Sequence, residues 1–302
     1  MQKQTTILKP DHKGIAEAAK LLVQGELVSF PTETVYGLGG DATNDHAVAA
    51  IFDAKQRPTF NPLIAHVPSV EAARKLTQWN ELAEKVAERF WPGPLTLVLP
   101  LTEGHGLSPL VTAELPTVAV RLPAHPIAQA LLKEVGRPIA APSANPSGRI
   151  SPTSVEHVVS GLNGRISAVL DGGACPVGLE STILGLVGEP SLLRAGGVPA
   201  EQLEDFLGLT LRSMAPGETI SAPGQLASHY APGARVRLGV SSAEAGEVLL
   251  GFGKMDCTLN LSESGDLVEA AANLFSHLHT LDALNPSGIA VAPIPDVGLG
   301  RA

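Results

Sequence analysis

The stretch between residues 27 and 67 constrains the fold of this chain more than any other. Its first and last segments have the continuous apolar pattern of buried strands, and the segment between them has the spacing of a helix. A turn rich in hydroxyls and glycines follows the first strand, Lys55 and Arg57 close the helix, and His66 lies on the second strand. Such a unit suits the binding of an anionic substrate at the edge of a sheet. We expect a strand at 27–30, a helix at 45–54 and a strand at 63–67.

The rest of the chain continues this alternation, which predicts an α/β fold. Residues 37–42 satisfy the loose pattern G-x-G-x-x-A, but six residues separate them from the preceding strand, so we expect a glycine turn and not a dinucleotide site. Further helices are expected at 14–24, 126–135 and 199–207, and further strands at 95–99, 117–122, 138–141, 168–171, 183–187 and 191–194.

Length and composition predict two domains. The chain has 302 residues, of which 44% are apolar, and its segment 208–233 is rich in proline and glycine. We expect a larger domain at 1–207, a linker that acts as a lid at 208–233, and a smaller α/β domain at 234–302.

The charge distribution favours a small anionic ligand. A formal net charge of −9 disfavours a general nucleic-acid binder, yet residues 115–150 hold four Lys and Arg against one acid. Residues 237–302 hold three against eight. Two distant cysteines, no secretory signal and no membrane-length apolar run predict a cytoplasmic protein without a disulfide framework, zinc site or membrane segment.

Several candidate residues have a structural explanation beside the functional one. Arg121 lies on the strand face opposite Val118 and Val120, and if half-buried it needs either a structural salt bridge or a ligand carboxylate. Lys55 and Arg57 are also the cations that a helix C-terminus favours. His66 can be an ordinary core histidine, and the loop 141–148 is either a set of donors for phosphate or a common turn.

Six blocks along the chain together carry a family resemblance. The chain resembles the YrdC-type L-threonylcarbamoyl-adenylate synthases over roughly residues 10–235, and the remainder resembles, less strongly, the C-terminal domain of their long form. The linker block SHYAP at 228–232 also matches. The six blocks are FPTETVYGLG at 30–39, KQRP at 55–58, WPGPLT at 91–96, VAVRLP at 118–123, APSANPSG at 141–148 and GLEST at 178–182.

The resemblance implies a fold and a reaction. The fold is a YrdC-like twisted open sheet with helices, which forms the catalytic domain, plus a smaller Rossmann-like α/β domain. The reaction joins L-threonine, bicarbonate and ATP into L-threonylcarbamoyl-adenylate and releases pyrophosphate, for the threonylcarbamoyl modification of the adenosine next to the tRNA anticodon. Mg²⁺ is expected with ATP, held mostly by phosphates and water, without a dedicated metal site in the protein. The downstream partner is the tRNA threonylcarbamoyl-transferase machinery, and direct tRNA binding is expected to be weak or absent.

The resemblance also implies roles for individual residues. The catalytic set is Lys55, Arg57, Ser143 and Asn145. The threonine-binding set is Thr34, His66, Arg121, Ala141 and Ser181. The ATP-binding set is Arg57, Asn61, Thr117, Ser143, Ser151, Arg194 and Tyr230.

Three other functions remain as alternatives. One is an RNA-binding YrdC-like module without synthase activity, which the negative charge and the 4% aromatic content disfavour. Another is carbamoyl transfer in hydrogenase maturation, whose zinc-finger cysteines are missing here. The third, a nucleotide-binding regulator, would not need the complete catalytic set.

Overall fold

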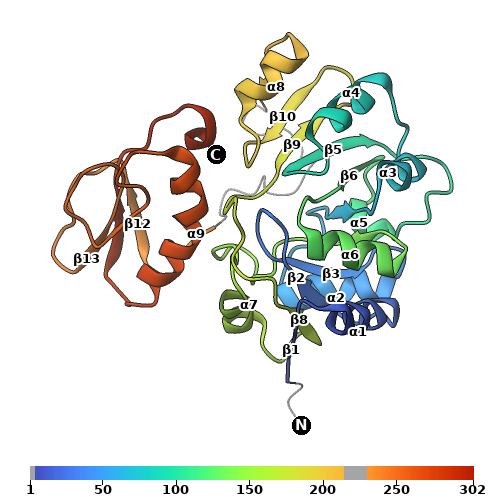
Figure 1. Cartoon of the computed structure of the whole chain (residues 1–302), viewed down its shortest axis with the longest axis horizontal. Coiled ribbons are helices and arrows are strands. Elements are labelled where there is room, and N and C mark those ends of the chain that lie inside the picture. The colour runs from blue at the N-terminus through green and yellow to red at the C-terminus, as the bar shows by residue number, and fades with distance from the viewer. Residues whose placement is uncertain (1–3, 214–229) are drawn as a thin grey trace.

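The computed structural model describes residues 4–213 and 230–302. Within these residues, one large mixed sheet and one small parallel sheet organise the chain (Figure 1). The large sheet has the strand order β1-β8-β2-β3-β7-β4-β6-β5-β9-β10-β11, and β1 and β11 are its edges. The α/β fold and the second, smaller α/β unit predicted from the sequence are confirmed.

The large sheet combines parallel and antiparallel neighbours. β4 and β6 are parallel and meet in the register Ile64 to Ala119 and His66 to Arg121. Its strands are β1 Thr6–Leu8, β2 Val28–Phe30, β3 Gly37–Asp41, β4 Ile64–His66, β5 Leu95–Pro100, β6 Thr117–Arg121, β7 Ile139–Ala140, β8 Ala168–Leu170, β9 Thr182–Gly185, β10 Ser191–Arg194 and β11 Arg212–Ser213. The last of these lies within the segment predicted as the linker.

Eight helices accompany this sheet in the described residues, and most begin at a side-chain cap. Asn44, for example, accepts hydrogen bonds from the amides of His46 and Ala47 and thereby begins α2. The helices are α1 His12–Val23, α2 Asp45–Lys55, α3 Val70–Leu76, α4 Glu81–Phe90, α5 Pro109–Thr112, α6 Pro126–Val135, α7 Val155–Leu162 and α8 Ala200–Leu207.

Both faces of the large sheet are packed, but unequally. The main core covers one face, where Val118 and Val120 of β6 lie. On the other face, α1 and α6 pack over β2, β7 and β8, while Ala119 belongs to a small separate cluster with Ile64. The predicted alternation along β6 is therefore confirmed, and Arg121 falls on the less covered face.

The expected glycine turn at 37–42 is wrong, because Gly37–Asp41 form strand β3, antiparallel to β2. Tight packing explains why this strand contains glycines. A Cβ added at Gly39 would lie 2.9 Å from the Phe30 ring and 3.1 Å from the Val28 carbonyl oxygen. Glycine here permits close packing within a strand and not a turn.

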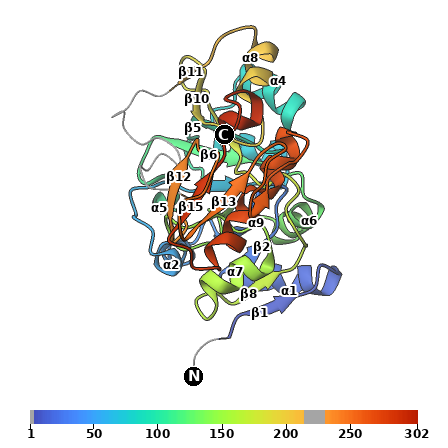
Figure 2. The same ribbon diagram turned by 90° about the vertical axis from the view of Figure 1, so that its left-hand side faces the viewer.

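The small sheet has the strand order β12-β15-β13-β14, with all neighbours parallel. Helix α9 lies on its side nearer the larger domain, and Figure 2 shows the small sheet in front of the large one. A Cβ at Gly178 would lie 2.4 Å from the Ala271 carbonyl oxygen of α9, so glycine permits this close approach. The elements are β12 Arg235–Leu238, β13 Glu247–Gly251, β14 Leu259–Asn260, α9 Leu267–Asp282, β15 Gly288–Val291 and the 3₁₀ helix Gly298–Arg301.

Two further contacts join the domains near the centre of the molecule. The rings of His157 and His279 stack with centroids 3.8 Å apart, and His279 Nε2 lies 3.1 Å from the Ser151 carbonyl oxygen. Val35 and Ile150 share a hydrophobic cluster with Phe275 of α9. No helix in the described residues is long and apolar enough to cross a membrane.

Candidate active site

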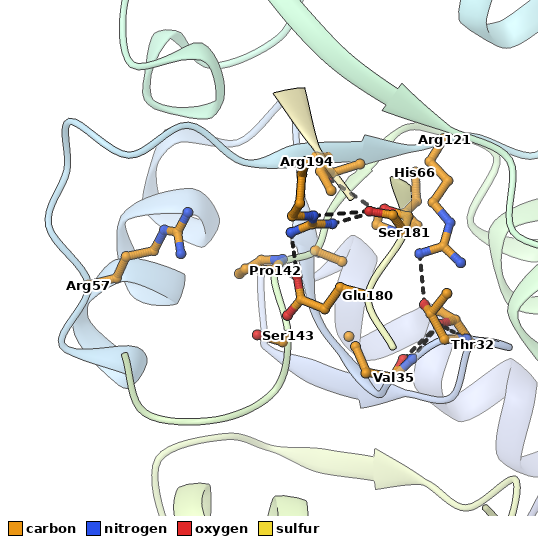
Figure 3. A pocket seen from close by; sticks show the side chains of 14 residues that line it. Thr32, Val35, Arg57, His66, Arg121, Pro142, Ser143, Glu180, Ser181 and Arg194 are labelled. Atoms are coloured by element: carbon orange, nitrogen blue, oxygen red, sulfur yellow. Dashed lines mark hydrogen bonds and ion pairs between the residues drawn. The ribbon is translucent and has the colours of Figure 1, made fainter. Parts of the chain in front are cut away.

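A pocket opens on the less covered face of the large sheet (Figure 3). Strands β4 and β6 contribute Ile64, His66 and Arg121. The first residue of β3, the last residue of β10 and several loops supply the rest of the wall. Its lining residues are Thr32, Thr34, Val35, Gly37, Arg57, Ile64, His66, Arg121, Ala141, Pro142, Ser143, Glu180, Ser181 and Arg194.

The structure brings eight of the predicted site residues to the lining and leaves six outside it. The eight are Thr34, Arg57, His66, Arg121, Ala141, Ser143, Ser181 and Arg194. The six outside the lining are Lys55, Asn61, Thr117, Asn145, Ser151 and Tyr230.

Arg121 lies at one end of the pocket and is 3% exposed. Its guanidinium donates to Glu33 Oε1 at 2.5 Å and to Thr34 Oγ1 at 2.9 Å, while its Nε donates to the Gly93 carbonyl at 3.3 Å. The structural salt bridge considered from the sequence is thus present, with Glu33. Because Arg121 also lines the pocket, the salt bridge does not remove it from the site, and both explanations considered from the sequence are compatible with the structure.

His66 lies beside Arg121 because the two residues pair across β4 and β6. The ring is 2% exposed, and its Nδ1 lies 3.3 Å from the Ile64 carbonyl oxygen. Burial lowers the pKa of His66 to about 3, and the charge of Arg121 contributes to the shift. The imidazole is therefore neutral near neutral pH, and offers a hydrogen bond without adding charge.

Arg194 lies nearer the middle of the pocket, at the end of β10 (Figure 3). It makes an ion pair with Glu180, and its NH2 group donates to Ser181 Oγ at 3.0 Å. Glu180 also accepts a hydrogen bond from Ser151 Oγ at 2.9 Å. Ser151 thereby joins the pocket indirectly, through Glu180.

The positions of Lys55 and Arg57 follow from the way helix α2 ends. Gln56 takes the left-handed conformation with φ 53° and closes the helix, so the two cations lie on either side of its cap. Lys55 is 1% exposed, and its Nζ donates to the carbonyls of Ser143 and Asn145 at 2.6 and 2.5 Å. It therefore holds the 141–148 loop from behind, which a solvent-exposed C-terminal cation does not do.

Burial dominates the electrostatics of these two cations. It lowers the pKa of Lys55 to about 7, and the neighbouring charge of Arg57 lowers it further. Burial also lowers the pKa of Arg57 to about 10, against the opposing effect of Glu180. A negatively charged ligand would relieve both shifts.

The 141–148 loop is fixed to β3, and its end carries polar atoms toward the site. Ser143 forms a bridge with Gly37, and the Ala144 amide donates to the Tyr36 carbonyl at 2.8 Å. Asn145 Nδ2 donates to the Arg149 carbonyl at 2.7 Å, whereas its Oδ1 is buried without a hydrogen-bond partner. The fixed position of the loop distinguishes it from an ordinary surface turn.

Asn61 is the most unusual of the residues outside the lining. It is fully buried, and neither Oδ1 nor Nδ2 of its amide has a hydrogen-bond partner. Buried unpaired amide atoms are costly and commonly mark the place of a ligand or water. Thr117, which is also predicted to bind ATP, begins β6, the strand that ends at Arg121.

Tyr230 approaches the pocket from the side of the small domain. Its ring packs against Phe275 with centroids 5.3 Å apart. Burial raises the pKa of its phenol, and the charge of Glu180 raises it further, so the ring lies beside Glu180. Residues 214–229 of the predicted lid, including Ser228 and His229, lie outside the described residues.

Sequence reasoning assigned no role to Thr32, Glu33 and Glu180. Thr32 and Glu180 line the pocket, and Glu33 pairs with Arg121. All three lie within the blocks 30–39 and 178–182. Each glutamate directly precedes a predicted hydroxyl ligand, which is the signal that could have found them.

Comparison with known proteins identifies the family. The Sua5, YciO and YrdC family model, described as "Telomere recombination", matches residues 20–196, and the model described as "Threonylcarbamoyl-AMP synthase, C-terminal domain" matches residues 198–302. A threonylcarbamoyl-AMP synthase of Bacillus subtilis is 40% identical over 99% of this chain and 93% of its own length. The chain belongs to the threonylcarbamoyl-AMP synthase family. Another member, from Pyrococcus abyssi, is 42% identical over 94% of this chain and 90% of its own length.

Solved structures of the threonylcarbamoyl-AMP synthase family agree with this assignment. Sua5 of P. abyssi, solved with L-threonine, matches with a TM-score of 0.90 and 39% identity over 98% of this chain and 94% of that chain. YciO of E. coli, 22% identical with a TM-score of 0.58, covers 64% of this chain and supports the fold alone. The resemblance and the fold expected from the sequence are confirmed, and the RNA-binding alternative is not favoured.

Proposed function

We propose that this chain synthesises L-threonylcarbamoyl-adenylate from L-threonine, bicarbonate and ATP, with release of pyrophosphate. The observation that carries the proposal is the pocket itself, in which two arginines, Arg121 and Arg194, lie among neutral donors. A reaction between two anionic substrates needs charge neutralisation at two places and close alignment between them. The P. abyssi relative, similar over nearly the whole chain, holds L-threonine in its structure.

The Arg121 end of the pocket suits threonine. The guanidinium of Arg121 would hold the substrate carboxylate, and the neutral His66 and Thr34 would bind the remaining polar groups. Ala141 and Ser181 complete this set. The substrate amine would take up carbon dioxide derived from bicarbonate and lose a proton, which gives a carbamate.

The Arg57 and Arg194 end suits the phosphates of ATP. Arg57, Ser143 and Arg194 line it directly, and Lys55 and Asn145 hold the loop that presents Ser143. A carbamate oxygen would attack the α-phosphorus, and pyrophosphate would leave with the electrons of the broken P–O bond. Asn61, Thr117, Ser151 and Tyr230 would bind the rest of the nucleotide.

Magnesium would enter with ATP as part of the substrate. The described residues contain no group of three or more His, Cys, Asp or Glu side chains placed to hold a metal ion. The phosphates and water would therefore supply most ligands of Mg²⁺, which commonly keeps several waters.

The product would serve the threonylcarbamoyl modification of the adenosine next to the tRNA anticodon. We propose that a separate transferase machinery takes up the adenylate in the cytoplasm. The net charge of −9 supports this division, because a chain of that charge attracts tRNA weakly.

Pyrophosphate release from ATP and bicarbonate tests the function, with and without L-threonine and with L-serine as competitor. We expect threonine-dependent release, a matching adenylate mass, and a sharp reduction in Lys55→Ala. Arg137→Ala, which changes a cation outside the pocket, is the matched control. ATP binding without threonine-dependent release would contradict the proposal.

A further inference from the structure

Two of the three arginines that line the pocket, Arg121 and Arg194, are held by the same arrangement of side chains. Arg121 binds Glu33 and the hydroxyl of the next residue, Thr34, at 2.5 and 2.9 Å. Arg194 makes an ion pair with Glu180 and binds the hydroxyl of the next residue, Ser181, at 3.0 Å. In each case a glutamate and the hydroxyl that follows it grip one guanidinium, and we call these arrangements the Glu33 clamp and the Glu180 clamp.

The likeness extends to a second hydroxyl. Thr34 Oγ1 lies 2.7 Å from Thr32 Oγ1, and Ser181 Oγ lies 2.7 Å from Thr96 Oγ1. Each clamp hydroxyl therefore has a fixed position before it meets the arginine. The second threonines come from unrelated segments, the β2–β3 loop and strand β5, so the arrangement is not a by-product of one repeated turn.

Carboxylates are unexpected in a pocket that receives anions, because they repel the ligand that the arginines attract. Burying the ion pairs is also costly, and such a pair is weak evidence for stability. The side chains of Glu33 and Arg121 are 8% and 4% exposed, and those of Glu180 and Arg194 are 12% and 9% exposed. What each carboxylate supplies is direction. Each guanidinium donates through all three nitrogens, to the glutamate, the hydroxyl and a backbone carbonyl, so its remaining N–H groups point along defined lines.

We propose that Glu33 and Glu180 are paired positioning residues: Glu33 directs Arg121 at the carboxylate of threonine, and Glu180 directs Arg194 at the phosphates of ATP. This inference rests on the proposed function. Neither glutamate needs to touch the substrate. Each raises affinity for its own ligand because its arginine does not have to be ordered when the ligand binds.

Different groups hold the two glutamates in place. Glu33 Oε2 accepts hydrogen bonds from the amides of Ala124 and His125, at 3.0 and 3.3 Å. Glu180 Oε1 instead accepts from Ser151 Oγ, a side chain on another loop. The Glu180 clamp therefore also fixes Ser151, a second predicted ATP-binding residue. Loss of Glu180 would weaken nucleotide binding both through Arg194 and through Ser151.

Separate binding measurements on isosteric variants test the assignment. Calorimetry with L-threonine alone and with a non-hydrolysable ATP analogue alone would be run on wild type, Glu33→Gln and Glu180→Gln. We expect Glu33→Gln to weaken threonine binding on the order of tenfold or more and to leave the ATP analogue within about threefold, and Glu180→Gln to show the reverse. KM values for the two substrates would follow the same split.

The matched control is Asp41→Asn, which neutralises another buried carboxylate paired with an arginine, Arg137, outside the pocket. It should change neither affinity. If a Gln variant does not fold, Glu33→Asp and Glu180→Asp keep the charge but withdraw it by one methylene, and should give the same split at smaller size.

Equal weakening of threonine and ATP-analogue binding in both variants, or no weakening in either, would overturn the positioning roles of Glu33 and Glu180, even in a chain that makes the adenylate. Conversely, the expected split in a chain that binds both ligands without releasing pyrophosphate would leave the clamps standing and remove the proposed reaction.

Discussion

The two halves of the pocket differ in what holds them. The half around Arg121 and His66 is built on adjacent strands of one sheet, with Thr34 in the loop beside them. The half around Arg57 and Arg194 is assembled from the end of a helix, the end of a strand and several loops. The proposed threonine half is thus fixed by neighbouring strands, whereas the proposed ATP half depends on several separate segments of the larger domain that converge at the pocket.

The small domain contacts the ATP half of the pocket at two places. Tyr230 packs on Phe275 of α9 and lies beside Glu180, and His279 meets the Ser151 carbonyl. On the threonine half, Val35 packs into the hydrophobic cluster of α9. ATP binding should therefore respond to changes in the second domain, and threonine binding hardly at all.

The largest effect is expected from Arg121→Ala. It removes the fork proposed for the threonine carboxylate and leaves Glu33 buried without its cation. Truncating one partner of a buried charge pair costs enough to lower threonine-dependent pyrophosphate release about 100-fold or more. Affinity for an ATP analogue should stay within threefold, and Arg137→Ala serves as the control. A comparable loss of analogue binding would show that the halves are not separate.

The next largest effect is a pH dependence of ATP binding, which threonine binding should not share. Burial lowers the pKa of Lys55 to about 7, so the free protein releases this proton as pH rises above 7. Bound phosphates favour the charged form and raise the pKa, so ATP binding should take up protons near pH 8 and weaken as pH rises, by up to about tenfold per pH unit. Calorimetry in buffers of different ionisation enthalpy measures the uptake.

Two comparisons decide whether Lys55 is the group that takes up the proton. Lys55→Met should abolish the uptake on ATP binding, and threonine binding to wild type should show little of it. Uptake that persists in the Met variant would assign the proton to another group.

A smaller effect is expected from Phe275→Ala in α9. The aromatic contact with Tyr230, with centroids 5.3 Å apart, would be lost, and such pairs contribute enough to weaken the ATP analogue about three- to tenfold. Threonine affinity should be unchanged. Leu284→Ala truncates an exposed side chain just beyond the same helix and is the control. Equal weakening of both ligands would mean that α9 supports the whole pocket.

The sequence predicted the strand face on which Arg121 lies, but not what holds its side chain. Strand alternation placed Arg121 opposite Val118 and Val120, and the structure agrees. Its partner Glu33 is 88 positions away, and a strand pattern carries no information on such pairing. The roles given to the individual site residues stay predictions.

Packing density explains the clearest failure. The glycines of Gly37–Asp41 have low intrinsic strand preference and so predict a turn, but contact with Phe30 and Val28 leaves no room for a Cβ at Gly39. Lys55 shows the same limit. A lysine at a helix end is normally solvated, and only the tertiary approach of the Ser143 and Asn145 carbonyls turns it inward.

The smallest effect is expected where the domains meet, from the stacked His157 and His279. Burial lowers the pKa of His157 to about 4, and His279 lowers it further. The unfolded chain, with an ordinary histidine pKa near 6.5, binds more protons below that pH. This part of the stability is therefore present above about pH 6.5 and is lost as pH falls toward 4.

His157→Phe keeps an aromatic ring at the contact but cannot take up the proton. We expect its melting temperature to fall less than that of wild type between pH 7 and 5, by about 2–4 °C, while threonine affinity at pH 7 is unchanged. ATP affinity should fall less on acidification than in wild type, because His279 also contacts the Ser151 carbonyl. Parallel pH dependence in wild type and variant would remove the histidine pair as the acid-sensitive contact, and with it the link between the domain boundary and the ATP half.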